Sequence, residues 1–427
     1  MTVGFFTLGC KVNQADSDAI SAHMAAAGYS PAPPESADIV VINSCTVTAE
    51  SDRKTRQTLR RFRKLNQDCI LVLTGCAVQV CDDLTQHYPE VDLILGQRDV
   101  RDLSRYVDEF LLSHHPITSV SPRQRNEAIE ASAHPLNSTR ATLKIQDGCE
   151  HFCSYCIIPH ARGPVRSKPL DDIRNEAKSL VAQGFQEIVL VGINLATYGK
   201  GNDCNLSDAV QAVAETGVAR TRLGSLEPDL LHENILQSLS RDKVLCPHFH
   251  LSLQSGCDNT LKRMKRRYDT LYYANLLKRL HQLFPDVSIT TDIMVGFPGE
   301  TEQEHMQSLE FVEQMSFSNV HVFPFSPRLG TLAAEFAGQL TKAEKQRRAA
   351  QALSLAKSLN RSFLSTQAQF THDVLLEQPY SGGGMQGYSA NYTPVVVLDA
   401  TPMQQNQIVQ ASISHTDEGK CFGNSLR

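Results

Sequence analysis

The residues best suited to chemistry are three cysteines within one short segment, Asp147 to Gly163. Cys149, Cys153 and Cys156 follow a C-x-x-x-C-x-x-C spacing. A cubane iron–sulfur cluster takes a thiolate on each iron, so three cysteines in one loop leave one iron without a protein ligand. An open coordination position lets a substrate bind the metal directly. The spacing therefore predicts a reactive metal centre; the alternatives are a zinc knuckle short of one ligand, or three unrelated thiols.

The first part of the chain, to about residue 112, alternates apolar and amphipathic segments. The apolar segments are short, continuous and β-prone, which is typical of strands in a parallel sheet covered by helices on both faces. Gly28 is a suitable stop for the first helix. The expected strands are 3–8, 38–43, 69–74 and 91–95, and the expected helices include 14–27, 52–65 and 98–112.

Three further cysteines share one position relative to these strands. Cys10, Cys45 and Cys76 each lie two residues past one of the first three strands. The carboxyl ends of parallel strands lie along one edge of a sheet, and ligands bind there. Gly9 and Gly75 precede two of the cysteines and permit the tight backbone of a loop that approaches a cluster. The topology therefore predicts that the three thiols meet, although three scattered structural cysteines remain the alternative.

A second α/β region follows a polar, proline-containing segment, residues 113–138, which is predicted to be a linker. Residues 139–369 are expected to form a partial or full (βα)6 barrel and a trailing helix. The loop of Cys149 follows the first barrel strand, so it lies at the carboxyl face, where barrels keep their active sites. Capping boxes at Thr301–Glu304 and Thr341–Glu344 mark two helix starts. The expected barrel strands are 141–146, 187–191, 219–223, 249–253, 287–294 and 319–323.

The last region, residues 370–427, has short β-prone segments separated by turns such as Gly382-Gly383-Gly384. This pattern predicts a small β-barrel, with a local excess of acidic residues. The chain as a whole also has a negative net charge, −5. Basic residues nevertheless gather in three clusters that can neutralise phosphates, although a solvated helix face is the alternative for each. The clusters span 53–64, 262–267 and 342–348.

The composition limits the classes of protein to which this chain can belong. The chain has 427 residues, of which 41% are apolar and 20% charged, and 12 are cysteines. These values fit a soluble globular protein of about three domains, at roughly 150 residues each. No run of about 18 apolar residues occurs, so no membrane span is expected. The N-terminus lacks the basic start of a signal peptide, which predicts a cytoplasmic protein; there, metal or redox use of cysteine is favoured over disulfides.

The cysteine loop after a first barrel strand resembles that of the radical S-adenosylmethionine enzymes. The other motifs resemble the methylthiotransferase family over nearly the whole chain. The segment Thr7–Gln14 (Thr-Leu-Gly-Cys-Lys-Val-Asn-Gln) is similar to the branch that acts on threonylcarbamoyladenosine in tRNA. Glu150 and Cys257 depart from the residues common in the family, Asn and Ser, but neither change removes a ligand. The supporting segments are 43–48, 74–77, 157–163, 252–256 and 295–301.

The resemblance implies a fold, cofactors and a reaction. It implies one [4Fe–4S] cluster on Cys149, Cys153 and Cys156, where S-adenosylmethionine binds the open iron. It implies a second on Cys10, Cys45 and Cys76, and two molecules of S-adenosylmethionine per turnover. The implied reaction is methylthiolation at C2 of N6-threonylcarbamoyladenosine, next to the tRNA anticodon. The alternatives are isopentenyladenosine in tRNA, a ribosomal protein, or a non-enzymatic iron–sulfur or zinc protein that binds RNA.

The resemblance also implies partners and further site residues. The partners would be the tRNA anticodon loop, a low-potential electron donor such as flavodoxin, and a sulfur donor; the terminal module resembles a TRAM domain, which contacts RNA. Residues at the carboxyl ends of barrel strands are often functional. Aromatic residues between the cluster ligands would shield the cluster or stack on adenine, and a glycine after a strand allows close approach of a ligand or simply a tight turn. The candidates for cofactor binding are Phe152, Tyr155, Gly192, Asn194, Glu227, Gln254, Ser255 and Gly296.

Overall fold

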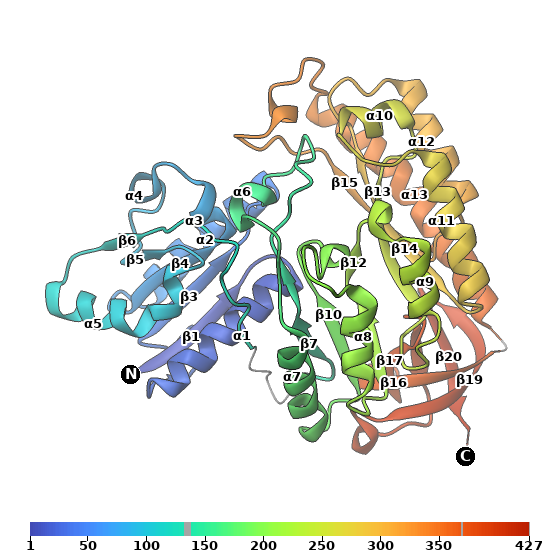
Figure 1. The fold of residues 1–427 in the computed structure, drawn as a ribbon, viewed down its shortest axis with the longest axis horizontal. Helices are drawn as coiled ribbons and strands as arrows, with labels where there is room; N and C mark the ends of the chain where they lie inside the picture. The colour runs from blue at the N-terminus through green and yellow to red at the C-terminus, as the bar shows by residue number, and fades with distance from the viewer. Residues whose placement is uncertain (132–137, 369, 427) are drawn as a thin grey trace.

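The computed structural model describes residues 1–131, 138–368 and 370–426 (Figure 1). The chain starts with a parallel sheet of order β2-β1-β3-β4-β5-β6. Neighbouring residues of β3 such as Val41 and Ile42 pack into different apolar cores on its two faces, as the continuous apolar strands predict. The strands are β1 (Thr2–Thr7), β2 (Ser30–Pro31), β3 (Ile39–Ser44), β4 (Ile70–Gly75), β5 (Leu93–Leu95) and β6 (Ile117–Ser119). The helices are α1 (Lys11–Ala26), α2 (Ala49–Leu65), α3 (Cys76–Val80), α4 (Leu84–His87) and α5 (Leu103–Ser113).

The sheet is wider than the sequence indicated, because β2 and β6 extend it at its two edges. β6 lies inside the segment predicted to be a linker and pairs in parallel with β5, Ile117 opposite Leu93. Its three residues are too few to show a strand period, and they follow two histidines and a proline. The prediction of a linker is therefore corrected over Ile117–Ser119. Residues 132–137 of that segment lie outside the described residues.

The central region is a partial barrel of parallel strands, as predicted. A break at Gly224 divides it into the sheets β11-β10-β7 and β12-β13-β14-β15. β12 (Ser225–Leu226) continues β11 after the break. The six expected strands are present as β7 (Ala141–Lys144), β10 (Glu187–Val191), β11 (Arg220–Leu223), β13 (His248–Gln254), β14 (Ser288–Val295) and β15 (Asn319–Pro324). The covering helices are α7 (Leu170–Ala182), α8 (Leu206–Ala214), α9 (Glu233–Leu239), α10 (Asp258–Arg263), α11 (Thr270–Leu283), α12 (Glu302–Gln314) and α13 (Lys342–Gln367).

The two predicted capping boxes have different outcomes. At the start of α12, Thr301 accepts from the Glu304 amide and Glu304 accepts from the Thr301 amide, so the box is complete. At the start of α13, Thr341 Oγ1 accepts from the Glu344 amide at 3.2 Å. The Glu344 carboxylate instead accepts from Arg347 and Arg348, both at 2.7 Å, and only half of this box forms. The trailing helix was expected to reach residue 369, which lies outside the described residues.

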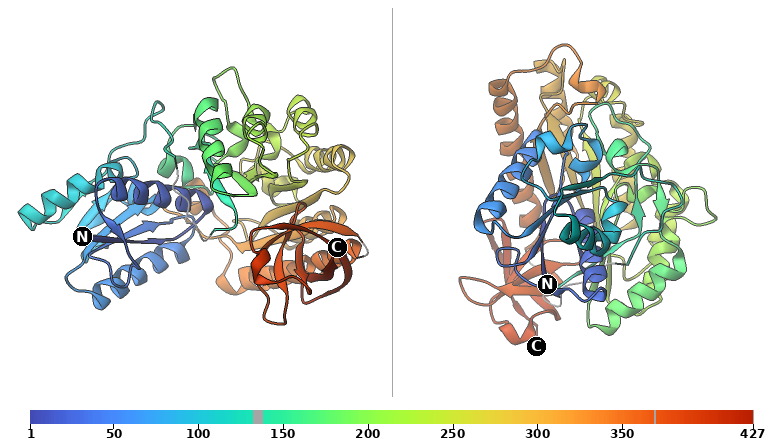
Figure 2. Two further views of the ribbon diagram at one scale, coloured as in Figure 1. Left: turned by 90° about the horizontal axis from the view of Figure 1, so that it is seen from below. Right: turned by 90° about the vertical axis from the view of Figure 1, so that its left-hand side faces the viewer.

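The C-terminal region is a closed barrel of order β16-β17-β18-β20-β19, which confirms the predicted β-barrel. It packs against the amino ends of the central strands (Figure 2). Arg220 donates to the Asp373 carbonyl at 2.6 Å, and Arg222 donates to the Ala390 carbonyl at 3.0 Å. The small barrel therefore forms a floor under the central strands. Its strands are β16 (Thr371–Pro379), β17 (Met385–Ser389), β18 (Pro394–Val397), β19 (Ile408–Asp417) and β20 (Lys420–Ser425).

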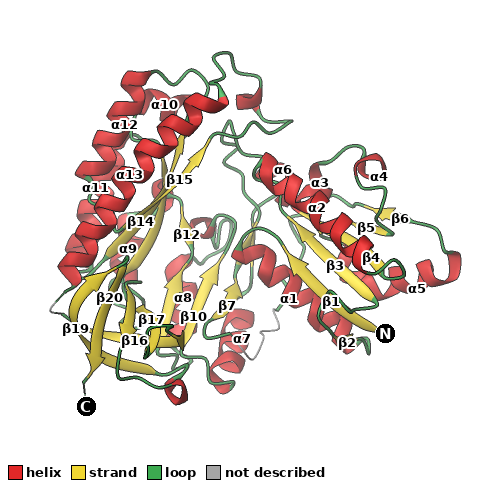
Figure 3. Cartoon of the chain, turned by 180° about the vertical axis from the view of Figure 1, so that it is seen from behind, coloured by secondary structure: helices red, strands yellow, loops and turns green. Residues whose placement is uncertain are grey.

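The N-terminal sheet docks against the open side of the partial barrel, with α1 beside β7 (Figure 3). Asp16 of α1 pairs with Lys144 at the end of β7 at 2.5 Å. At the other end of the interface, Arg328 pairs with Asp52 at the start of α2 at 2.6 Å. Ion pairs thus fix the carboxyl edge of the first sheet against the barrel. Of the described helices, none combines the length and the apolar character needed to cross a membrane.

Candidate functional site

The three thiols that follow β1, β3 and β4 meet at one edge of the N-terminal sheet; Cys10, Cys45 and Cys76 are called the first triad below. Cys10 caps α1, and Cys76 begins α3. The Cys10 and Cys76 sulfurs lie 3.8 and 3.9 Å from the same atom, Asn13 Oδ1. A Cβ placed on Gly9, which has a φ of 108°, would lie 3.2 Å from the Cys45 sulfur. Only glycine therefore fits beside the triad at this position.

Asn13 and Arg162 hold the first triad in place. The Asn13 amide donates to the Leu8 and Ser44 carbonyls, both at 2.9 Å, which fixes the loops after β1 and β3. Arg162 also donates to Asn13 Oδ1, and its Nε donates to the Cys76 sulfur at 3.3 Å. The guanidinium is buried and pairs with Asp16 at 2.6 Å. Sequence reasoning did not assign a role to either residue.

Cys149, Cys153 and Cys156, the second triad, occupy the loop between β8 (Gln146–Asp147) and α6 (Ile158–Arg162). Burial raises the pKa of each of these thiols, to about 12 for Cys156, and the neighbouring Cys153 and Cys149 add to that rise. Burial likewise raises the pKa of Cys76 to about 11, against the opposing charge of Arg162.

Each triad thus fits a metal cluster. Three thiols gathered in one place become stable thiolates together only beside metal cations that offset their charge. An iron–sulfur cluster would supply such cations, and the three cysteines of each triad would hold it. All cysteines of the chain are free, so no disulfide competes for these sulfurs.

Of the two residues predicted after β10 as cofactor contacts, Asn194 lies beside the second triad, whereas Gly192 packs on Gln146 and lines a cavity with Cys10 of the first triad. Asn194 Nδ2 is 3.9 Å from the Cys149 sulfur, and its backbone amide donates to Gln146 Oε1 at 2.8 Å. Asn194 Oδ1 is buried without a partner in the described residues. An unsatisfied amide oxygen needs a donor, which the ammonium group of a ligand would supply. A Cβ on Gly192 would lie 2.6 Å from Gln146 Oε1, so packing alone requires this glycine.

Arg266 links Glu227 and Tyr155 to the second triad. It donates to the Glu227 carboxylate, to the Cys153 sulfur at 3.3 Å and to the Tyr155 hydroxyl at 3.5 Å. Burial raises the pKa of Tyr155 well above its usual value, which keeps the phenol neutral. Phe152, by contrast, is 53% exposed and has a left-handed φ of 48°. Its ring is therefore available at the surface of the loop rather than buried against the protein.

The remaining candidates sit in turns that the protein itself stabilises. Gln254 has a left-handed φ of 69° where the pairing of β13 with β14 shifts register. Ser255 Oγ accepts from the Cys257 amide at 3.3 Å. The Gly296 amide donates to Glu300 Oε2 at 2.7 Å, and its φ is 71°. A tight turn accounts for Gly296, and ligand contact by these residues stays a prediction.

Many residues of the basic clusters form ion pairs within the protein that stabilise the fold. Arg63 pairs with Asp92 at 2.5 Å and Arg348 with Glu300 at 2.7 Å. These arginines are therefore less available to phosphates than their charge suggests. The basic cluster residues whose side chains make no hydrogen bond or ion pair in the described part of the chain are Lys54, Arg56, Lys64, Lys262, Lys265, Lys342 and Lys345, the last of which lies over the Phe325 ring.

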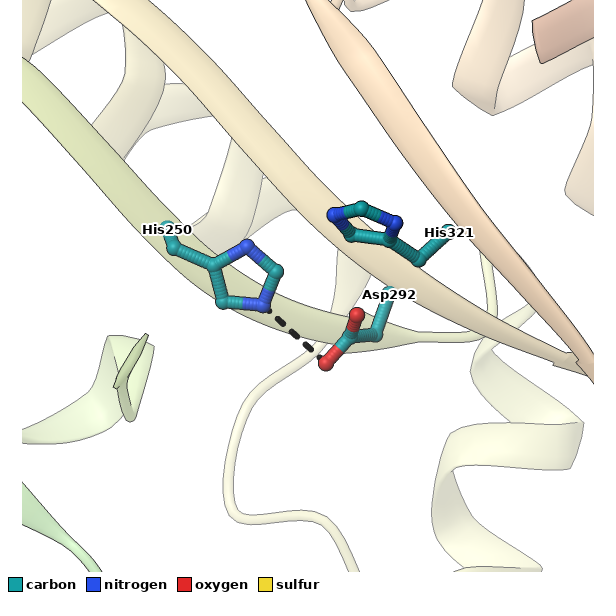
Figure 4. Close-up of side chains that lie close together, drawn as sticks. All are labelled: His250, Asp292 and His321. Atoms are coloured by element: carbon teal, nitrogen blue, oxygen red, sulfur yellow. Dashed lines mark ion pairs between the residues drawn. The ribbon is translucent and has the colours of Figure 1, made fainter. Parts of the chain in front are cut away.

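A cavity of about 760 Å³ lies between the first triad, the wall of the partial barrel and the small barrel. His250 and His321 line it, with Asp292 between them on β14 (Figure 4). His250 Nε2 lies 3.0 Å from Asp292 Oδ2, and one ligand atom from each of the three residues lies within 4.8 Å of the others. The arrangement can bind a cation or hydrogen-bond a base. The sequence does contain a signal for this polar wall: polar residues at alternate positions of a strand, such as His248 and His250, point to the same face of the sheet.

Residues 2–96 match the uncharacterized protein family UPF0004, and residues 143–312 match the Radical SAM superfamily. The threonylcarbamoyladenosine tRNA methylthiotransferase MtaB of Bacillus subtilis is 36% identical over 405 residues, which cover 92% of this chain and 90% of the relative. A tRNA-2-methylthio-N(6)-dimethylallyladenosine synthase of Carboxydothermus hydrogenoformans is 32% identical over 383 residues, which cover 87% of each chain.

The solved structures agree at the level of the fold. The radical S-adenosylmethionine methyltransferase TsrM from Kitasatospora setae superposes with a TM-score of 0.57 at 14% identity, over 78% of this chain and 77% of that chain. At this identity the likeness concerns the fold alone. The sequence relatives extend across the N-terminal sheet, the partial barrel and most of the remainder. This chain belongs to the radical S-adenosylmethionine tRNA methylthiotransferases.

Proposed function

We propose that this enzyme methylthiolates C2 of N6-threonylcarbamoyladenosine in tRNA, beside the anticodon, with a [4Fe–4S] cluster on each cysteine triad. The observation that carries the proposal is the close approach of the two triad regions around one side chain. Arg162, in the helix that follows the loop of the second triad, donates to Cys76 of the first triad at 3.3 Å and lies 3.6 Å from Asp147, which precedes the second. Sulfur insertion needs a radical generator and a sulfur carrier that face one substrate, and two adjoining triads suit that requirement.

The residues around the triads bind and orient, whereas the cofactors supply the reactivity. When bound, the clusters and S-adenosylmethionine supply radical formation, sulfur and the methyl group. Asn194 presents its unsatisfied oxygen to the amino group of the cofactor beside Cys149. Arg266 donates to Cys153, which stabilises that sulfur as a thiolate. Glu227 and Tyr155 hold Arg266 in this position.

The choice of nucleoside rests on two observations. The relative that acts on threonylcarbamoyladenosine, by its name, is more similar to this chain than the dimethylallyladenosine enzyme, at 36% against 32% identity. The cavity beside the first triad also contains the cationic side chains of Lys11 and Arg222 next to apolar residues such as Phe363, so it offers a charged partner to the threonylcarbamoyl group that a dimethylallyl group would not use. The proposal further includes a low-potential electron donor such as flavodoxin, a sulfur donor and a cytoplasmic site of action, alongside tRNA.

Analysis of modified nucleosides tests this function. Digests of tRNA from a strain that lacks the gene should contain threonylcarbamoyladenosine but no methylthio derivative of it. Methylthio-dimethylallyladenosine and the masses of the ribosomal proteins should not change in the same strain. Unchanged methylthio-threonylcarbamoyladenosine would refute the proposed nucleoside. Anaerobic reconstitution should give about eight irons per chain with matching sulfide, whereas zinc without sulfide would exclude the two clusters.

A further inference from the structure

The wall of the 760 Å³ cavity carries several basic side chains, and the Asp292 carboxylate between two of its histidines is already paired with His250 at 3.0 Å. Among the described residues, its lining includes Lys11, Arg222 and three histidines, but no aspartate and no glutamate. A concave surface with one sign of charge concentrates ligands of the opposite sign. The charge of the cavity therefore suits an anionic group on the substrate.

Arg222 already has its partners within the protein. Its Nε donates to Glu187 Oε1 at 2.6 Å, and its Nη1 donates to the Ala390 carbonyl at 3.0 Å. Glu187 is shared in turn with Arg140 and Arg220, each at 3.9 Å. Three guanidinium groups thus share this single buried carboxylate, and none of the hydrogen bonds or ion pairs of the described residues joins it to Lys11.

The histidines of the wall are also engaged or uncharged. His248 stacks on Tyr392 with ring centroids 4.8 Å apart, and its Nε2 lies 3.2 Å from Thr290 Oγ1. His250 is paired with Asp292. Burial lowers the pKa of His321, which favours the neutral ring. Neither Arg222 nor the histidines therefore offer a free positive charge to a ligand.

Lys11 is different, because no hydrogen bond or ion pair joins its ammonium group to any described residue. It is the first residue of α1, directly after Cys10, and its side chain is exposed to the cavity. A lysine that is partly enclosed by protein and lacks a counter-ion is a ready partner for an anion. Cys10 and Lys11 both line the cavity, so this charge and the first triad face the same space.

We infer that Lys11 binds the carboxylate of the threonylcarbamoyl group and thereby selects this nucleoside over those with an uncharged N6 substituent. The inference rests on the proposed function and specifies how its substrate is recognised. The carboxylate is the one anionic group of the modified base, and pairing with Lys11 holds that base on the side of the cavity where Cys10 lies. A dimethylallyl group would leave the ammonium group unpaired against an apolar surface, which is unfavourable.

Equilibrium binding to labelled anticodon stem-loop RNA tests this role. The reconstituted enzyme, without reductant, is titrated with RNA that carries threonylcarbamoyladenosine or its methyl ester. The wild type should bind the acid about tenfold or more tightly than the ester, because a charged hydrogen bond is lost. Lys11→Gln should bind the two RNAs equally, and Lys11→Arg should keep most of the preference. Lys178→Gln, an exposed lysine of α7 with the same change of charge, should match the wild type.

The outcomes separate this inference from the function on which it rests. The preference is the ratio of two Kd values measured on the same protein preparation. Incomplete cluster loading of a variant affects both Kd values equally and therefore does not change the ratio. A wild type that prefers the acid, together with a Lys11→Gln variant that keeps the full preference, would overturn Lys11 as the anchor alone. A wild type that binds and methylthiolates only dimethylallyladenosine RNA would overturn both the proposed nucleoside and its anchor.

Discussion

Arg162 Nε lies 3.3 Å from the sulfur of Cys76, although Arg162 ends α6 and Cys76 begins α3 in different regions of the chain; both residues are buried. The same guanidinium lies 2.6 Å from Asp16 on α1 and 3.6 Å from Asp147, which precedes the second triad. Its charge is thereby shared between a thiol and two carboxylates. This one side chain therefore bridges Cys76 of the first triad and the Asp147 carboxylate that precedes the second.

Replacing Arg162 with methionine should empty the first triad and leave the second loaded. The variant loses the cation beside Cys76 and a donor to Asn13, which both help to hold thiolates together. Iron per chain should fall from about eight to about four. The unfolding free energy should fall by about 3 kcal/mol or more, because buried carboxylates lose a partner. Arg125→Met, at an exposed ion pair with Glu150, is the control, and full iron in Arg162→Met would contradict the assignment.

Cys76→Ala should separate the two halves of the reaction. The second triad is intact in this variant, so cleavage of S-adenosylmethionine should continue while methylthiolated RNA falls below detection. Both products can be quantified in one anaerobic assay by liquid chromatography. Cys81→Ala, a half-buried cysteine shortly after α3, should behave as the wild type. Full methylthiolation by Cys76→Ala would end the proposal of a second cluster.

Asn194→Ala should weaken the binding of S-adenosylmethionine without loss of iron. The variant removes the unsatisfied Oδ1 near Cys149, and the cofactor then loses an acceptor for its amino group. Loss of one such hydrogen bond should raise the Kd for the cofactor about 10-fold. Equilibrium dialysis of reconstituted protein measures this change, with the exposed Asn202→Ala as control. An unchanged Kd would show that the Asn194 side chain stabilises the loop and does not contact the cofactor.

The metal-free protein should lose stability in alkali, because folding raises the pKa of Cys76 to about 11 and that of Cys156 to about 12. In the unfolded chain a cysteine has a pKa of about 8.5. The protonated thiols stabilise the folded state fully below that value, and this stability is lost as pH rises through the folded values.

Melting temperatures between about pH 8 and pH 11 test this dependence. They should fall less for a Cys76→Ser, Cys156→Ser double variant than for the metal-free wild type, since other groups also titrate in this range. The cluster-loaded protein should lack this contribution, because iron holds the thiolates throughout. Parallel melting curves for the metal-free wild type and the double variant would contradict the assignment of these two thiols.

The sequence predicted the elements with strong periodicity and those with distinctive local spacing. The central strands, the small barrel and the second triad are of this kind. The convergence of Cys10, Cys45 and Cys76 followed from one rule, that parallel strands end along one edge. β6 was missed because a three-residue edge strand depends on its partner rather than on its own pattern.

The side-chain network around the triads could not be predicted, because it depends on contacts between residues far apart in the chain. Arg162 and Asn13 are 149 positions apart, and nothing local marks either as a partner of a thiol. Arg266 was assigned to a basic cluster for phosphates, yet it is buried against Cys153 and Glu227. An exposed arginine can bind phosphates, whereas a buried one stabilises the fold. Burial depends on the tertiary structure, so the local sequence does not reveal it.

The floor formed by the small barrel has a consequence for the order of synthesis. Arg220 and Arg222 find their carbonyl acceptors at Asp373 and Ala390, which are 153 and 168 residues further along the chain and so leave the ribosome later. The N-terminal sheet has its own apolar cores and can collapse while translation continues. The chamber beneath the first triad closes only after the strands of the small barrel emerge. Its wall is therefore completed later than the N-terminal sheet that carries the first cysteine site can fold.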